Sequence, residues 1–130
     1  MIVTHSRPEP YAVEFSDGKH TGLADAIVAD GGSETGFKPF ALLEASLATC
    51  TAMTIRMYAD RHGWALPGLA VRVKYDQSSA EAPVLRYDID FGATDLAPDI
   101  CERLLRIATA CPVHKALSKP MMVVRSELRK

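Results

Sequence analysis

The stretch from Lys38 to Asp60, KPFALLEASLATCTAMTIRMYAD, decides the fold of this chain. Between Pro39 and Ile55 its only charged side chain is Glu44. A helix at a protein surface has one apolar stripe and one polar face, whereas apolar side chains here occupy several faces. Proline is favoured at the first helical position, and a His-Gly pair soon after the stretch is a reasonable stop. The pattern therefore predicts a long helix that is covered nearly all round.

Two cysteines stand out as candidate chemical groups. Cys50 lies near the middle of the predicted helix. A buried cysteine is often only a small hydrophobic residue, so the sequence leaves both a packing role and a reactive role open for Cys50. Cys111 lies directly before Pro112, which predicts that Cys111 caps a second, short helix. Main-chain N–H groups at a helix start favour a thiolate over a thiol. His114 falls in the same first turn, where a functional role and a solvent-facing position are equally open.

Around these cysteines the chain resembles the OsmC/Ohr family of osmotically inducible and organic hydroperoxide resistance proteins, in its smaller OsmC-like branch. The resemblance covers nearly the whole chain. It is carried by Pro39, Leu42, Leu43, Ala48, Cys50, Thr51, Ala52, Met53, Thr54, Met57, Tyr58, Ala59, His62, Gly63, Trp64, Val71, Val73, Cys111, Pro112, Val113, His114, Leu117 and Ser118. Upstream it includes Gly18, His20, Ala24, Asp25, Gly31 and Gly32.

The resemblance implies a thiol-dependent peroxidase that reduces organic hydroperoxides in oxidative stress defence. By the family's motif Cys50 is the attacking thiol and Cys111 the resolving one, although the predicted helix start alone would favour the reverse. Two intertwined subunits would build two equivalent sites and bring the cysteines together. The implied partners are a small hydroperoxide, an external dithiol reductant and a second copy of the chain, with no metal or organic cofactor.

One departure from the family pattern concerns activation of the thiol. The family usually has a glutamate two residues after the helix-opening proline, paired with an arginine over the reactive thiol, and here that position is Ala41. The nearest acid is Glu44, almost one turn later. Arg7 and Arg56 are the candidates for this arginine, but the sequence pattern assigns the role to neither of them. We therefore expect low peroxidase efficiency.

Length and composition limit the classes of protein that remain. A chain of 130 residues with 48% hydrophobic content predicts one domain, residues 1–130, with a real core. The formal net charge of −1 gives no basic surface for nucleic acid or a membrane. The first ten residues lack the apolar core of a signal peptide, which predicts a cytoplasmic protein. Three cysteines argue against a disulfide framework.

The remaining segments predict an α+β domain in which an antiparallel sheet packs on the helices. Alternating patterns predict a hairpin over 11–15 and 21–29 and a second over 69–75 and 84–91. A helix follows over 96–110, with Thr94 or Asp95 near its cap and Pro98 and Asp99 in its first turn, and a last strand over 121–128. Cys101, beside the apolar stripe of that helix, is interpreted as a packing residue. The glycine-rich loop 30–36 lacks phosphate-binding spacing.

Other classes of function require different groupings of these residues. A Cys–His hydrolase would pair Cys111 with His114 but finds no orienting acid nearby. A zinc site from Cys101, Cys111 and His114 lacks a fourth ligand. His20 and Asp25 are interpreted as an exposed hairpin pair. The serious alternative is a non-catalytic OsmC-like dimer that binds a small apolar ligand.

Overall fold

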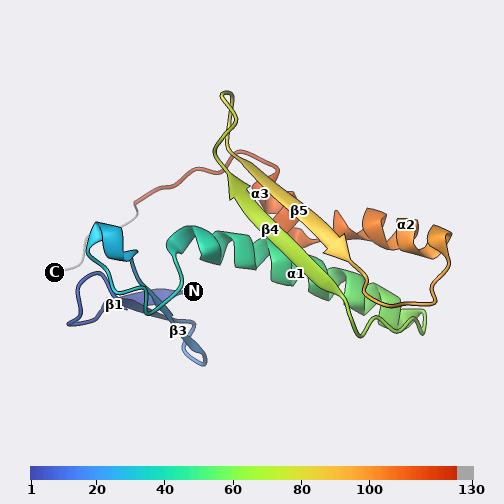
Figure 1. Ribbon diagram of the computed structural model, residues 1–130, viewed down its shortest axis with the longest axis horizontal. Coiled ribbons are helices and arrows are strands. Elements are labelled where there is room, and N and C mark those ends of the chain that lie inside the picture. Colours follow the sequence, from blue (N-terminus) through green and yellow to red (C-terminus); the bar gives the residue numbers. More distant parts are fainter. Residues whose placement is uncertain (126–130) are drawn as a thin grey trace. The chain divides into compact units, whose positions relative to one another are not determined.

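The computed structural model describes residues 1–125, which form two compact units, Met1–Ala45 and a second that starts at Ser46. The order of elements is three strands, a 3-10 turn, a long helix, two strands and two helices, and Figure 1 draws them in colours that follow the sequence. Strands pair in antiparallel fashion within two separate sheets. The fold is therefore α+β, as the order of predicted elements indicates.

The first unit contains a three-stranded sheet in the order β1-β2-β3. Its strands are β1 (Val3–Ser6), β2 (Val13–Ser16) and β3 (Thr21–Ala24). The hairpin of β2 and β3 confirms the first predicted pair, but its second strand ends at Ala24 and not at residue 29. A 3-10 turn, η1 (Val28–Asp30), follows instead. The sequence pattern does not predict β1 because all of its residues are exposed and no apolar alternation marks them.

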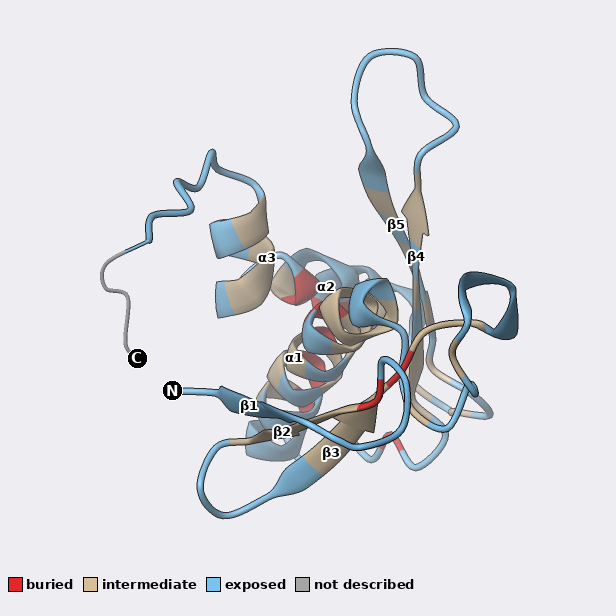
Figure 2. Ribbon diagram, turned by 90° about the vertical axis from the view of Figure 1, so that its left-hand side faces the viewer, coloured by how far each residue is buried: buried red, intermediate tan, exposed pale blue. Residues whose placement is uncertain are grey.

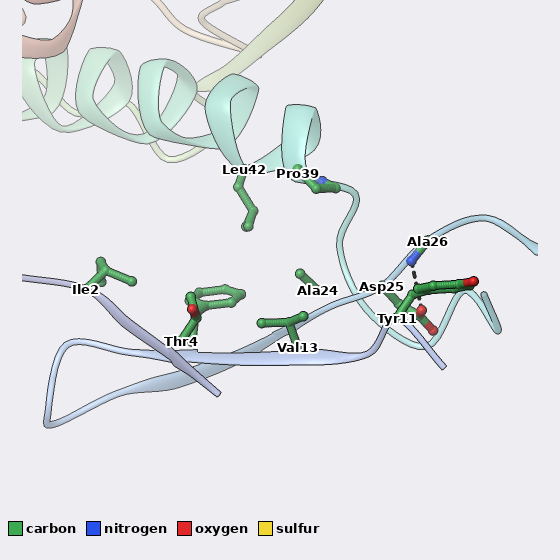
Figure 3. Close-up of a pocket in the computed structure, with 10 residues that line it drawn as sticks. Ile2, Thr4, Tyr11, Val13, Ala24, Asp25, Ala26, Pro39 and Leu42 are labelled. Carbon is green, nitrogen blue, oxygen red and sulfur yellow. Dashed lines mark hydrogen bonds between the residues drawn. The ribbon is translucent and has the colours of Figure 1, made fainter. Parts of the chain in front are cut away.

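Asp25 explains why β3 ends early. Its side chain is 3% exposed, and one carboxylate oxygen accepts a hydrogen bond from the Ala26 N–H at 2.7 Å, drawn in Figure 3. The other oxygen accepts bonds from the main-chain N–H groups of Ser33 and Thr35 at 3.1 Å and from the Thr35 hydroxyl at 2.8 Å. A single carboxylate thus holds the second half of the glycine-rich loop against the segment that follows β3.

The interpretation of His20 and Asp25 as an exposed pair is wrong for Asp25. His20 is exposed as expected, but its ring pairs with Asp17 in the hairpin turn at 3.0 Å. Burial of Asp25 was not evident because a lone acid after a strand is more often solvated. Only the loop that folds back over Asp25 supplies the donors that make its burial favourable.

We expect Asp25 to make the first unit sensitive to acid. The hydrogen bonds from Thr35, with those from Ala26 and Ser33, outweigh burial and hold the pKa of the carboxyl below its ordinary value of 3.8. A lowered pKa contributes stability that is fully present above the ordinary value and is lost as the pH falls through the folded-state value. Denaturant unfolding between neutral pH and pH 2 should therefore show a fall in stability that Asp25→Asn reduces. An unchanged acid slope in Asp25→Asn would contradict this role for Asp25.

The second unit contains the long helix predicted from the opening stretch and the hairpin that packs on it. The helix, α1, runs over Pro39–Arg61, so its predicted start and end are each displaced by one residue, and its part from Ser46 belongs to this unit. The hairpin consists of β4 (Ala70–Asp76) and β5 (Val84–Asp90), with Val73 opposite Tyr87. Its residues alternate between exposed and partly buried positions over most of both strands, as the sequence predicts.

Two further helices, α2 (Pro98–Ala108) and α3 (Pro112–Leu117), complete the described part of the second unit. The predicted caps of α2 are wrong, because Ala97 is its N-cap residue and Pro98 opens the helix. The Thr94 hydroxyl instead accepts the Leu96 N–H at 3.3 Å, in the loop before the helix.

The core of the second unit lies between α1, α2 and the hairpin. Its buried cluster consists of Ile55, Ala59, Leu66, Leu104 and Ala108. Figure 2 shows buried positions along α1 and α2. This cluster joins the helix that carries Cys50 to the helix that leads into Cys111.

The last predicted strand is wrong where the structure describes it. Residues 121–125 form no strand, and the remainder of the predicted strand lies outside the described residues. In the same described part, Met122 and Val123 are 90% and 102% exposed, so their apolar side chains pack on nothing within the chain.

Candidate active site

The site consists of two thiols from different helices. Cys50 lies on α1, and Cys111 lies immediately before α3. Both are free cysteines, and each influences the pKa of the other. This mutual influence supports the prediction that the two residues are spatial neighbours.

Local structure at Cys111 follows from the proline after it. Pro112 occupies the first helical position, and Cys111 is the N-cap residue, as predicted. Its sulfur accepts the main-chain N–H of His114 at 3.4 Å. A side chain of this kind replaces the partner that the first N–H groups of a helix lack.

The two thiols differ in their access to solvent. Cys111 has 0% of its surface exposed, whereas Cys50 is partly exposed. Met53 and Met57 follow Cys50 at three and seven positions, on the same side of α1. Both methionines are 58% exposed, so the surface that leads to Cys50 is apolar.

The two thiols also differ in acidity. Burial, together with the hydrogen bond to Cys111, raises the pKa of the Cys50 thiol. Burial acts in the same direction on Cys111, but interactions with Cys50, His114, Thr51 and Val113 outweigh it and lower the pKa of the Cys111 thiol. The lowered pKa agrees with the position of Cys111 at a helix start.

Thr51 is a residue of the site that sequence reasoning missed. It is 1% exposed, and its hydroxyl oxygen has no hydrogen-bond partner within the described part of the chain. Thr51 also lies close enough to Cys111 to help lower the pKa of its thiol, although no hydrogen bond joins the two groups. A threonine within a helix is a weak signal, since most helical threonines bond to a carbonyl of the preceding turn. The place of Thr51 beside Cys111 becomes visible only in the folded structure.

His114 takes a different place from the one that a Cys–His hydrolase requires. Its main-chain N–H, and not its ring, donates to Cys111. The ring packs edge-on against Tyr87 of β5, with ring centroids 5.9 Å apart. Across residues 1–125, no group of three or more histidine, cysteine and acidic side chains is placed to hold a metal ion.

The candidate arginines each have an acidic partner. Arg7 pairs with Glu14 of β2 at 2.9 Å, within the first unit. Arg56 pairs with Asp60, one turn along α1, also at 2.9 Å. Glu14 was not predicted as a partner, because the residues lie on either side of the β1–β2 turn. An arginine held by an acid is therefore present in the chain even though Ala41 replaces the family's glutamate.

The third cysteine lies apart from this chemistry. Cys101 is a partly buried residue of α2, and its thiol approaches the Leu96 carbonyl oxygen at 4.0 Å. This placement agrees with the interpretation of Cys101 as a packing residue.

The fold and the site together define an α+β protein with a paired-thiol centre. The family model described as OsmC-like protein matches residues 31–126, and the chain belongs to this family. No curated protein matches the chain.

Solved structures of this family share the fold. An OsmC-like protein from Mycoplasma pneumoniae has a TM-score of 0.69 at 19% identity, over 91% of this chain and 86% of that chain. An organic hydroperoxide resistance protein OsmC from Legionella pneumophila has a TM-score of 0.59 at 22% identity, over 90% and 87%. The organic hydroperoxide resistance protein OhrB of Bacillus subtilis has a TM-score of 0.61 at 17% identity, over 89% and 87%.

The long helix is not a membrane span. Over the described residues, no helix has both the length and the apolar character needed to cross a bilayer.

Proposed function

We propose that this protein is a thiol-dependent peroxidase that reduces organic hydroperoxides, with Cys50 as the attacking thiol and Cys111 as the resolving one. The observation that supports it best is the pair of neighbouring free thiols, of which Cys50 is partly exposed and Cys111 is buried. Membership of the OsmC-like family and the fold shared with hydroperoxide resistance proteins agree with this chemistry.

The reaction needs only the two thiols, a hydroperoxide and an external dithiol. The Cys50 sulfur attacks the distal oxygen of the hydroperoxide, the O–O bond breaks, and the alkoxide takes a proton and leaves as an alcohol. Cys50 is now a sulfenic acid. The Cys111 thiolate attacks its sulfur, a disulfide forms, and hydroxide leaves and is protonated to water. An external dithiol, as the reducing cytoplasm supplies, then restores both thiols.

Exposure supports this assignment of roles. A hydroperoxide arriving from solvent meets the partly exposed Cys50 and not the fully buried Cys111. If the sites lie at the interface of a dimer, the methionines on the same side of α1 line the approach to Cys50 there and favour a substrate with an apolar group over hydrogen peroxide. Because the pKa of Cys50 is raised and Ala41 supplies no acid to hold an arginine over it, the rate should be modest.

Stopped-flow mixing of the reduced protein with cumene hydroperoxide tests this function. We expect the loss of two thiols per chain with release of the alcohol, and renewed turnover on addition of dithiothreitol. The reaction should be faster with cumene hydroperoxide than with hydrogen peroxide. Thiol loss no faster than that of free cysteine would refute the peroxidase.

A binding protein for a small apolar ligand is the second candidate. It is favoured by a cavity of about 600 Å³ in the first unit, drawn in Figure 3. Its lining consists of Ile2, Thr4, Tyr11, Val13, Phe15, Ala24, Asp25, Ala26, Pro39 and Leu42. A fluorescent apolar probe that binds to a protein with inert thiols would support this candidate over the peroxidase.

We also propose that the protein is a two-fold dimer, since α1 leaves apolar side chains uncovered in a single chain. Phe40, Met53 and Met57 are 52%, 58% and 58% exposed. Light scattering should therefore give twice the chain mass of 14.1 kDa. Met57→Lys, at a position already exposed in the single chain, should shift the equilibrium towards monomer while the circular dichroism stays unchanged. A wild-type protein that remains a soluble monomer at micromolar concentration would contradict the dimer.

A further inference from the structure

The three-stranded sheet of the first unit has a hollow on one face, and the pairing register shows which residues form it. Phe15 of β2 lies opposite Thr4 of β1 and Gly22 of β3. Val13 lies opposite Ala24. Directly opposed residues share a face of a sheet, and so do residues two apart along a strand. Because β3 contributes only a glycine and an alanine to this face, the space above β3 is left unfilled.

The beginning of α1 covers this hollow. The Phe37 N–H donates to the Leu23 carbonyl at 2.8 Å, and the Asp25 N–H donates to the Phe37 carbonyl at 3.1 Å. These bonds fix the segment before α1 to the end of β3, within one compact unit. Pro39 and Leu42 then lie above the sheet, as Figure 3 shows. The cavity of about 600 Å³ therefore has its floor and its roof in the same unit.

Tyr11 lines the same cavity with a backbone conformation that is uncommon for a tyrosine. Its φ of 65° lies in the left-handed region, which is unfavourable for a residue with a Cβ. The turn between β1 and β2 holds it there. In that turn the Arg7 N–H donates to the Ala12 carbonyl at 2.9 Å, and the Ala12 N–H donates to the Glu9 carbonyl at 3.2 Å. Strained residues cluster at ligand sites, where the position of the side chain is what matters.

The ring of Tyr11 packs against the glycine-rich loop. A Cβ at Gly31 would lie 3.0 Å from the Cε2 atom of Tyr11, so only a glycine leaves room for the ring at this distance. Tyr11 is 64% exposed, which places it at the rim of the cavity. Figure 3 shows Tyr11 and Ile2 at opposite ends of the cavity. The turn and the loop together thus fix an aromatic ring at one end of an apolar space.

The charges of the lining favour an uncharged ligand. Among residues 1–125, no lysine, arginine or histidine lines the cavity, so a bound anion would have no partner. Asp25 is the acid of the lining, but its oxygens already accept hydrogen bonds from its own loop. A cation would therefore find little remaining acceptor capacity. The other polar side chains of the lining are the hydroxyls of Thr4 and Tyr11, which suit a ligand with a hydroxyl group.

We propose that this cavity binds an uncharged small molecule with an apolar body, such as an aliphatic alcohol, and that the strained backbone of Tyr11 places its ring against that ligand. This proposal deepens the second candidate function and rests on it for the presence of a ligand. It holds whether or not the thiols reduce a peroxide, because the lining contains no cysteine. The volume is typical of small-molecule sites, and apolar cavities take up apolar molecules.

Fluorescence of N-phenylnaphthylamine, an uncharged apolar probe, tests the ligand class. We expect saturable binding to the parent protein and displacement of the probe by octanol. Octanoate and octylammonium should each require a concentration about tenfold higher or more, because their charge is buried without a partner. Equal displacement by all three molecules would overturn the ligand class. A parent protein that binds no probe would overturn the site and the second candidate function together.

Ala24→Leu tests the location of the bound probe, because a larger side chain on this face fills the cavity. It should lower the affinity for the probe by about tenfold or more, as expected for added methylenes in an apolar pocket. Val3→Leu is the matched control, since Val3 lies on the opposite face of β1, and it should leave the affinity unchanged. Binding that Ala24→Leu does not weaken would overturn this site, while a ligand-binding function elsewhere in the chain survived.

Tyr11→Asn tests the strained residue and remains informative if Ala24→Leu fails to fold. Asparagine tolerates the left-handed conformation, so the variant should be at least as stable to denaturant as the parent protein. It should bind the probe about fivefold more weakly, the effect of one lost aromatic contact. Glu34→Asn is the control, because Glu34 has a φ of 53° but lies outside the lining. Equal probe affinity in Tyr11→Asn and Glu34→Asn would overturn the role of Tyr11.

A second copy of the chain is the rival occupant of the cavity. If the cavity is a small-molecule site, the parent protein and the Met57→Lys variant that favours the monomer should bind the probe equally well. Binding by the monomeric variant alone would mean that a second copy fills the cavity, and it would overturn the proposal.

Discussion

Cys50→Ser should abolish the reduction of cumene hydroperoxide, lowering the turnover rate by about a thousandfold or more. Removal of a nucleophile from a site that works as a unit commonly costs at least this much. Serine is close to cysteine in size, so the fold should survive the change. The measurement is steady-state consumption of the hydroperoxide with excess dithiol.

Cys111→Ser provides the matched comparison because it removes the other member of the pair. It should still consume up to one equivalent of hydroperoxide per chain, more slowly than the parent protein, and then accumulate a sulfenic acid that dimedone traps on Cys50. An external thiol would react with this sulfenic acid only slowly. If Cys50→Ser kept turnover and Cys111→Ser lost even the first equivalent, the roles of the thiols would be the reverse of those proposed.

Sequence patterns predict the elements of this fold that contain strong local signals. The boundaries of α1 follow from the opening proline and from a long apolar stretch with one acid. The cap of α3 follows from the Cys-Pro pair, because proline specifies the first helical position whatever surrounds it. The β4–β5 hairpin follows from the alternation of apolar and polar residues in the sequence, and in the structure these residues alternate between partly buried and exposed positions. Each of these signals is contained within a few residues.

What the sequence did not predict depends on contacts between distant segments. From the sequence alone, Asp25 resembles an ordinary surface acid. Its burial depends on the loop that brings the N–H groups of Ser33 and Thr35 to its carboxylate. Arg7 and Glu14 become partners only because β1 and β2 pair. In each case the relevant donor or charge is supplied by tertiary structure.

The two cysteines show how resemblance and physical chemistry combine. The family motif assigns the attack to Cys50, whereas the helix start and the surrounding donors favour ionisation of Cys111. These statements agree if access, and not acidity, decides which sulfur meets the hydroperoxide, because Cys50 is partly exposed and Cys111 is fully buried.

Leu104→Ala should destabilise the second unit by about 3 kcal/mol, the usual cost of removing a leucine side chain from a closed core. Leu104 is 0% exposed and belongs to the buried cluster that includes Ile55 of α1 and Ala108 of α2. Neighbouring side chains are held by helices and cannot fully collapse into the space that the leucine leaves. Denaturant unfolding followed by circular dichroism measures the change in the free energy of unfolding.

Leu105→Ala is the matched control on the same helix. Leu105 is 46% exposed, so the same chemical change there should cost less than about 1 kcal/mol. The contrast also bears on the thiols, because the cluster joins the helix of Cys50 to the helix that leads into Cys111. In Leu104→Ala the fully buried Cys111 should therefore become open to alkylation by iodoacetamide, as read from the modified peptide, while in Leu105→Ala it stays protected. Equal protection of Cys111 in both variants, with Leu104→Ala destabilised as expected, would mean that the thiol pair is held by α3 and its cap alone.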